Sequence, residues 1–159
     1  MKRIEINLGT QELTLFQDAD IERVYPVSTA YNGPGEQLGS GCTPRGRHII
    51  RAMIGRDMPF NTVFVGRRPT GEAYNTKLRD RHPNRDWILT RILWLSGCEP
   101  GFNRLGNVDS MRRYIYIHGA PDEVKMGQPG SHGCIRMHNL NVVDLFGRVQ
   151  PGTPVHIIE

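Results

Sequence analysis

Apolar and polar residues alternate along much of this chain with the period of two that is typical of β-strands. Alternate apolar residues over 4–8 mark a first strand, residues 9–11 form a turn, and residues 13–15 continue on a second strand. Further strands are predicted over residues 24–31, 48–54, 62–65, 87–95, 113–118 and 155–158. The pattern therefore predicts a mostly β protein.

Helical spacing of apolar residues is clear in one place, over residues 139–149. The segment 67–86 is polar throughout and is predicted to be the longest loop. The 18 glycines and 11 prolines indicate many turns between short elements. A length of 159 residues suits a single core. We therefore expect one domain over residues 1–159, with one or two short helices beside the strands.

Composition excludes several classes of protein. Hydrophobic residues make up 38% and charged residues 23% of the chain, which is enough to form a core and argues against disorder. No run of about 18 apolar residues is present, so no transmembrane helix is expected. The formal charge of +4 is not gathered into a stripe, and the densest basic segment, 77–91, also holds acidic residues and proline. We expect neither nucleic acid nor a membrane as partner.

The chain start and the cysteines bear on location. Residues 1–3 lead directly into the first strand, with no apolar leader segment. Cys42, Cys98 and Cys134 are odd in number and far apart, which is not a disulfide framework. Both features favour a reducing cytoplasm. A leader removed from upstream would leave the same sequence, so a periplasmic location is the alternative.

The candidate catalytic residues lie around Cys134, in the segment Gly130-Ser131-His132-Gly133-Cys134-Ile135-Arg136-Met137. His118 stands 16 positions earlier, at the predicted end of a strand. A thiol and an imidazole brought together across a loop are the parts of nucleophilic catalysis. An adjacent imidazolium would increase the thiolate fraction of Cys134. Gly133 would let its own N–H and that of Cys134 point at a developing oxyanion.

These residues allow two other interpretations. A cysteine taken alone is most often a small buried apolar residue, but the polar, glycine-rich surroundings of Cys134 argue against that interpretation. A zinc site could draw on His118, His132, Cys134 and His138, yet their spacing matches no closed zinc motif. We expect no metal and no other cofactor.

The pattern Ile117-His118-Gly119, then Gly127 and residues 131–137, followed by a helix and Pro151-Gly152-Thr153-Pro154-Val155, closely resembles the catalytic domain of the L,D-transpeptidases, the YkuD-like family. Thr43-Pro44-Arg45-Gly46 is similar to the family's Thr-Pro-x-Gly turn, so the resemblance covers nearly the whole chain. It implies the YkuD-like fold, with β-sandwich-like mixed sheets and a helix beside the catalytic loop.

The resemblance also implies roles for individual residues. Cys134 becomes the acylated nucleophile, His118 the general base, and the carbonyl of Gly119 the group that orients the imidazole. Gly133 and Cys134 supply oxyanion donors. The other two cysteines match no catalytic position of the family.

Further residues would surround the substrate. Ser131 and His132 are expected to line the pocket. Arg136 either meets a substrate carboxylate or forms a salt bridge that holds the loop. Tyr116 and Trp94 either line a substrate groove or pack in the core.

The reaction implied is attack of the thiolate on the carbonyl at the L-centre of diaminopimelate in a tetrapeptide stem, with loss of the terminal D-alanine. The thioester is then resolved by an amine to give a 3→3 cross-link, by a D-amino acid in exchange, or by water. Because no leader is seen, we predict a cytoplasmic L,D-carboxypeptidase acting on muropeptides. Alternatives are a periplasmic L,D-transpeptidase and an inert peptidoglycan-binding module. The resemblance also implies acylation by β-lactams of the carbapenem type.

Overall fold

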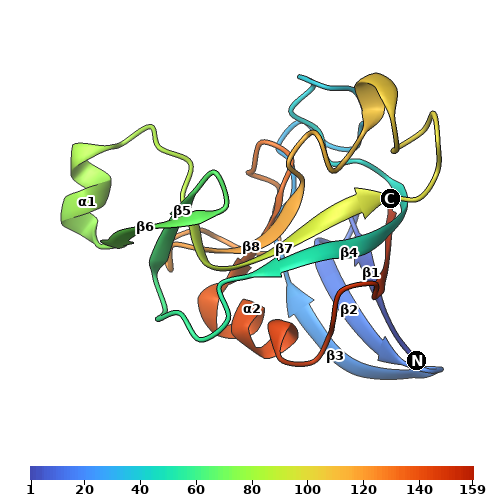
Figure 1. Ribbon diagram of the computed structural model, residues 1–159, viewed down its shortest axis with the longest axis horizontal. Coiled ribbons are helices and arrows are strands. Elements are labelled where there is room, and N and C mark those ends of the chain that lie inside the picture. Colours follow the sequence, from blue (N-terminus) through green and yellow to red (C-terminus); the bar gives the residue numbers. More distant parts are fainter.

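The computed structural model describes residues 1–159 and is dominated by strands (Figure 1). The strands are β1 (Lys2–Asn7), β2 (Glu12–Gln17), β3 (Asp20–Pro26), β4 (Gly46–Ile54), β5 (Thr62–Val65), β6 (Arg68–Ala73), β7 (Ile88–Gly97), β8 (Tyr116–Ala120), β9 (Ile135–His138) and β10 (Pro154–Ile158). The helices are α1 (Thr76–Arg81) and α2 (Asn139–Phe146), with a 3-10 turn over Gly106–Val108. The prediction of a mostly β protein with short helices is confirmed. Neither α-helix has the length and apolar character needed to cross a membrane.

All ten strands belong to one mixed sheet. Its main path runs β3-β2-β1-β10-β4-β7-β5-β6, and β8 branches from β7 and pairs with β9. The β1–β10 and β8–β9 pairs are parallel and the others antiparallel. Figure 1 shows β1, β2 and β3 at one end of the curled sheet, and β5, β6 and α1 projecting as an arm at the other.

The core is formed by 18 buried apolar residues, and it fixes the strand that carries His118. Alternate residues of β1 and β2, such as Ile4 and Leu13, are buried as the sequence pattern predicts. Helix α2 packs on β7 and β8 and buries Val142 and Leu145. Burial of each such side chain stabilises the fold by about 1.5–3 kcal/mol. Because β8 is buried along its whole length, the residues it carries are held firmly.

The polar segment 67–86 is not a single loop, and that prediction is wrong. It forms β6 and α1, and the side chain of Asn75 caps α1 by accepting a hydrogen bond from the backbone N–H of Leu78 at 2.8 Å. No residue of α1 is buried, and β6 is exposed on both faces. Elements without a buried face carry no apolar periodicity, so the sequence pattern could not reveal them.

Strand boundaries near the site also differ from the prediction. Strand β8 continues through Ala120, so His118 lies in its middle and not at its end. Strand β9 begins directly after Cys134, where only a loop was expected. The predicted strand over 24–31 is instead β3, which ends at Pro26, and α2 stops at Phe146 rather than at residue 149.

His48 of β4 makes stability depend on pH. Its ring is buried, with Nε2 2.8 Å from Ser110 Oγ, and burial lowers the pKa of His48 from 6.5 to about 4. Between these pH values, His48 therefore binds a proton in the unfolded chain but not in the folded one. We expect the free energy of unfolding to fall as pH drops through this window, by about 3 kcal/mol from this residue.

Urea unfolding between pH 7 and pH 4.5 measures this effect. The His48→Gln variant, which cannot titrate at this position, should show a shallower decline than the parent protein. Equal slopes for the two proteins would contradict the assignment.

Candidate active site

A cavity of about 570 Å³ opens beside β8 and collects most of the predicted site residues. Five of them line it: Tyr116, His118, Ser131, His132 and Cys134. Gly119 and Gly133 adjoin it through their backbones, and Arg136 lines a neighbouring cavity. Segments far apart in the sequence complete the wall with Arg67, Asp86 and Arg113.

His118 is held in an orientation that suits a base. It is 1% exposed, and its Nδ1 lies 2.6 Å from the carbonyl oxygen of Gly119. A carbonyl can only accept, so Nδ1 carries the proton and donates, which leaves Nε2 with a free lone pair. Burial lowers the pKa of His118, which keeps the ring neutral. The Gly119 carbonyl thus stands where the family pattern implies.

Cys134 rests as a neutral thiol. Its Sγ accepts a hydrogen bond from the backbone N–H of Tyr116 at 3.3 Å and donates to the carbonyl of Tyr114 at 3.3 Å. Burial raises the pKa of Cys134 to about 12. The expected imidazolium beside a thiolate is therefore not the resting state, because desolvation disfavours the charged form of both groups.

Ser131 shapes the loop that presents Cys134. Its hydroxyl donates to the carbonyl of Cys134 at 2.6 Å and accepts the N–H of Gly133 at 3.2 Å. The N–H of Gly133 is thus engaged and does not point freely at an oxyanion as predicted. The N–H of Cys134 has no partner within the protein, which makes it the donor available to an oxyanion.

Glycine is required at two positions of the site by close packing. Gly133 has a φ of +136°, and a Cβ there would lie 3.2 Å from the carbonyl oxygen of Cys42. A Cβ on Gly119 would fall 2.6 Å from the carbonyl oxygen of Leu89 and closer still to Asn139. Any larger residue at Gly119 would displace the carbonyl that orients His118.

Thr43, from the Thr-Pro-x-Gly turn, ties the catalytic loop to the body of the protein. Its buried Oγ1 donates to the carbonyl of Gly133 at 2.9 Å and accepts the backbone N–H of Ala30 at 3.0 Å. The sequence motif identified this turn, and the structure explains it as the support for the residue before Cys134.

Replacing Thr43 with valine should lower the free energy of unfolding by about 1–3 kcal/mol. Valine keeps the shape but leaves the N–H of Ala30 and the carbonyl of Gly133 buried without a partner. Urea unfolding measures the loss, and Thr43→Ser, which retains the hydroxyl, should recover most of it. Equal stability of the valine variant and the parent would contradict this role.

Two arginines of the cavity wall belong to no sequence motif, so the sequence did not predict them. The guanidinium of Arg113 is half-buried and donates only to neutral groups, including the carbonyl of Cys42 at 2.7 Å. Arg67 lies at the tip of the β5–β6 hairpin, with its guanidinium 4.7 Å from the ring centre of Trp94, and donates to Tyr116 Oη at 3.2 Å. Both place positive charge at the cavity without a carboxylate partner.

The remaining candidates have distinct surroundings. The ring of Tyr116 is buried edge-on against Trp94, with centroids 5.9 Å apart, so packing is its main role even though it borders the cavity. Trp94 packs and does not line the cavity. Arg136 donates to Ser28 Oγ at 3.0 Å and forms no salt bridge, so the loop-holding ion pair is not present. His132 is exposed at the cavity wall.

His118, His132 and Cys134 line the same cavity, whereas His138 does not. No group of three histidine, cysteine or acidic side chains in the structure is arranged to hold a metal ion.

A partly buried thiol and a carbonyl-oriented imidazole in one cavity are the arrangement of enzymes that transfer acyl groups through cysteine. A family model described as the L,D-transpeptidase catalytic domain, YkuD, matches residues 1–157. The chain belongs to this family, whose members are cysteine-dependent peptidoglycan enzymes.

Two relatives from Bacillus subtilis, both provisionally named L,D-transpeptidases, are similar in sequence. YqjB is 30% identical over 154 residues, which cover 97% of this chain and 69% of that protein. YkuD is 30% identical over 113 residues, which cover 69% of this chain and 58% of that protein.

Solved structures share the fold. An L,D-transpeptidase from Mycobacterium smegmatis superposes with a TM-score of 0.58 at 17% identity, covering 99% of this chain and 58% of that one. L,D-transpeptidase 3 from Mycobacterium tuberculosis gives a TM-score of 0.62 at 15% identity, covering 99% and 61%. The chain thus spans about three fifths of these longer chains.

Proposed function

We propose that this protein is a cysteine L,D-carboxypeptidase that removes the terminal D-alanine from peptidoglycan tetrapeptide stems. The observation that carries the proposal is that Cys134 and His118 line one cavity, with Nδ1 of the imidazole fixed by the Gly119 carbonyl. Membership of the family supports a peptidoglycan stem as substrate.

Acylation begins when Nε2 of His118 takes the thiol proton of Cys134 as the sulfur attacks the carbonyl carbon at the L-centre of the third stem residue. The N–H of Cys134 donates to the oxyanion of the tetrahedral intermediate. The C–N bond then breaks, the proton on Nε2 passes to the leaving nitrogen of D-alanine, and a thioester remains on Cys134.

Deacylation repeats these steps with water. His118 accepts a proton from the attacking water, the C–S bond breaks, and the proton returns to the sulfur of Cys134. The products are a tripeptide stem and free D-alanine.

Charge around the cavity supports a carboxylate-bearing substrate. Arg67 and Arg113 line the cavity, and neither is paired with an acidic side chain. Positive groups of this kind favour the binding of an anionic peptide stem.

The choice of water as acceptor rests on location, which we propose to be the cytoplasm. All three cysteines are free thiols, which suits a reducing compartment. Stems met there are soluble fragments rather than the assembled wall, so a second stem is rarely at hand to act as acceptor. A periplasmic L,D-transpeptidase is the competing assignment.

Mass analysis of the products tests the proposal. The protein is incubated with a free tetrapeptide stem, alone and with an excess of a D-amino acid. We expect the tripeptide and D-alanine as main products in both cases. Cross-linked dimers or exchanged tetrapeptide as the main product would overturn the hydrolase in favour of a transpeptidase. An unchanged stem would favour a binding module. Fractionation of cells that express the natural gene tests the cytoplasmic location.

A further inference from the structure

Strands β7 and β8 are out of step where they pass the catalytic histidine. Leu89 of β7 pairs with Gly119, and Ile92 pairs with His118. Three steps along β7 therefore match one step along β8, so the two residues between Leu89 and Ile92 form a bulge opposite the His118–Gly119 peptide. Bulges are frequent next to active sites, where they change the direction of a side chain.

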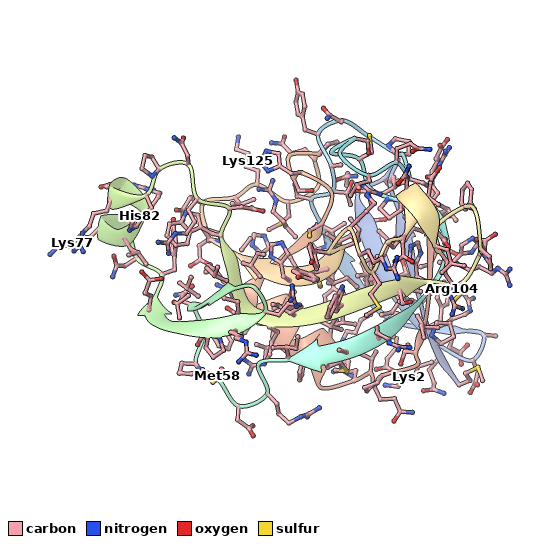
Figure 2. All side chains as sticks on the ribbon, turned by 45° about the horizontal axis from the view of Figure 1, so that its top comes forward. Lys2, Met58, Lys77, His82, Arg104 and Lys125 are labelled. Carbon is pink, nitrogen blue, oxygen red and sulfur yellow. The ribbon has the colours of Figure 1, made fainter.

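Thr90, the first residue of this bulge, has a strained backbone. Its φ is +73°, which is rare for a β-branched residue, and its side chain is fully buried. The next residue, Arg91, binds the Thr90 carbonyl through Nη1 at 2.6 Å and the Met58 carbonyl at 2.8 Å. Met58 lies on the loop that joins β4 to β5 (Figure 2). Such strain persists where surrounding contacts enforce it, and it is concentrated at functional sites.

The hydroxyl of Thr90 is the centre of a buried network of polar side chains. Its Oγ1 donates to Oδ1 of Asn139, at the start of α2, at 2.7 Å and accepts the backbone N–H of Asn61 at 3.1 Å. Nδ2 of Asn139 in turn donates to Oδ1 of Asn61 at 2.9 Å. The network thus joins β7, α2 and the β4–β5 loop. Buried polar groups that satisfy one another hold a single arrangement.

This network lies directly against Gly119. A Cβ on Gly119 would overlap Oδ1 of Asn139, and it would lie 2.6 Å from the carbonyl oxygen of Leu89 and 3.1 Å from Cβ of Thr90. The carbonyl of the same glycine lies 2.6 Å from Nδ1 of His118. Because this donor and acceptor belong to adjacent residues, their hydrogen bond depends on the backbone geometry of the pair, which the contacts on Gly119 restrict.

We propose that Thr90 and Asn139 are positioning residues for His118. They hold the Gly119 peptide so that its carbonyl accepts from Nδ1, which keeps the proton on Nδ1 and leaves Nε2 free to take the proton of Cys134. This inference rests on the proposed function, in which His118 is the base. Neither Thr90 nor Asn139 lines the catalytic cavity, so both act through the imidazole and not on the substrate.

The tautomer of His118 reports this positioning directly. Nitrogen NMR of isotope-labelled protein distinguishes Nδ1 from Nε2, and the signals of His118 are those missing from His118→Ala. At pH 8 the unaltered protein should hold mainly the Nδ1–H form. Thr90→Val keeps the β-branched shape but removes the hydroxyl that binds Asn139. The ratio of Nε2–H to Nδ1–H should then rise by about fivefold, as expected when one hydrogen bond is lost.

Turnover gives a second readout. Thr90→Val should lower kcat for D-alanine release by about 10- to 100-fold, because a misaligned base transfers the proton less well. KM should change by less than about twofold, since uniform substrate binding is untouched. Asn139→Ala should have the same effects. Thr90→Ser retains the hydroxyl and should recover both the tautomer ratio and kcat to within about threefold.

Thr153→Val is the matched control. Thr153 is also buried, and its Oγ1 donates to the carbonyl of Gln150 at 2.7 Å and accepts the N–H of Gln150 at 3.2 Å. It lies on the turn before β10, outside the catalytic cavity. The same substitution there removes a buried hydroxyl with two hydrogen bonds, and it should leave the tautomer of His118 and kcat unchanged.

An unchanged tautomer ratio in both Thr90→Val and Asn139→Ala would overturn the proposal. So would an equal change in Thr153→Val, which would indicate general loosening of the fold. If Thr90→Val does not fold, Asn139→Ala decides by the same measurement. The spectra need no substrate. Absence of D-alanine release by the unaltered protein therefore refutes the proposed function, whereas the tautomer ratios judge the positioning role separately.

Discussion

Replacing Cys134 with alanine should lower turnover by at least about 10⁴-fold, because the acyl-enzyme cannot form. Cys134 should also be the residue acylated by a carbapenem. Intact-protein mass spectrometry after incubation with imipenem should show one added acyl group on the unaltered protein and none on the variant.

Cys42 provides the control for this experiment. Its backbone carbonyl packs against Gly133, but its thiol donates to the carbonyls of Asn32 and Ser40. Cys42→Ala should therefore be labelled as fully as the unaltered protein. Labelling of Cys134→Ala, or loss of labelling in Cys42→Ala, would show that the nucleophile is misassigned.

Replacing His118 with alanine should reduce turnover by about 10²- to 10⁴-fold, the usual contribution of a general base. The pH profile gives the sharper readout. The base works only when unprotonated, so the rate of the unaltered protein should rise with pH through the pKa of His118, which lies below 6.5. In the variant this acidic limb disappears, and the rate should instead rise at alkaline pH as the thiol of Cys134 ionises.

His82→Ala serves as the control, since His82 is exposed beside α1 and outside the catalytic cavity. It should leave both the rate and the profile unchanged. A circular-dichroism spectrum of His118→Ala that matches the parent would show that the lost activity is not lost fold. Unimpaired turnover in that variant would refute the base assignment.

The strands that could be predicted are mainly those with at least one covered face, and β7 and β8 are covered on both. In β1 and β2 the buried and exposed residues alternate, so the sequence carries the period directly. Strand β6 and helix α1 lack a buried face and left no such period. Strand β9 is four residues long and exists because Ile135 pairs with Ile117 of β8, a contact between segments that local sequence cannot reveal.

The residues of the site likewise fall into those that the sequence could predict and those that it could not. Cys134, His118 and Gly119 belong to a local pattern, and the sequence was sufficient to propose them. Arg113 and Asp86 reach the cavity from separate segments, so no spacing connects them with Cys134. The N–H of Gly133 donates to the Ser131 hydroxyl, and the position of that hydroxyl depends on the folded loop, which the sequence pattern does not show.

The partly buried, neutral thiol of Cys134 affects how the protein reacts with oxidants and alkylating agents. Because burial raises its pKa, very little of the thiol is ionised at pH 7. Peroxide and simple alkylating agents react with the thiolate, so they should find Cys134 a poor target. An acyl donor that fits the cavity brings its own carbonyl to the sulfur beside His118. The resting protein should therefore react with acyl donors that fit the cavity in preference to oxidants and alkylating agents.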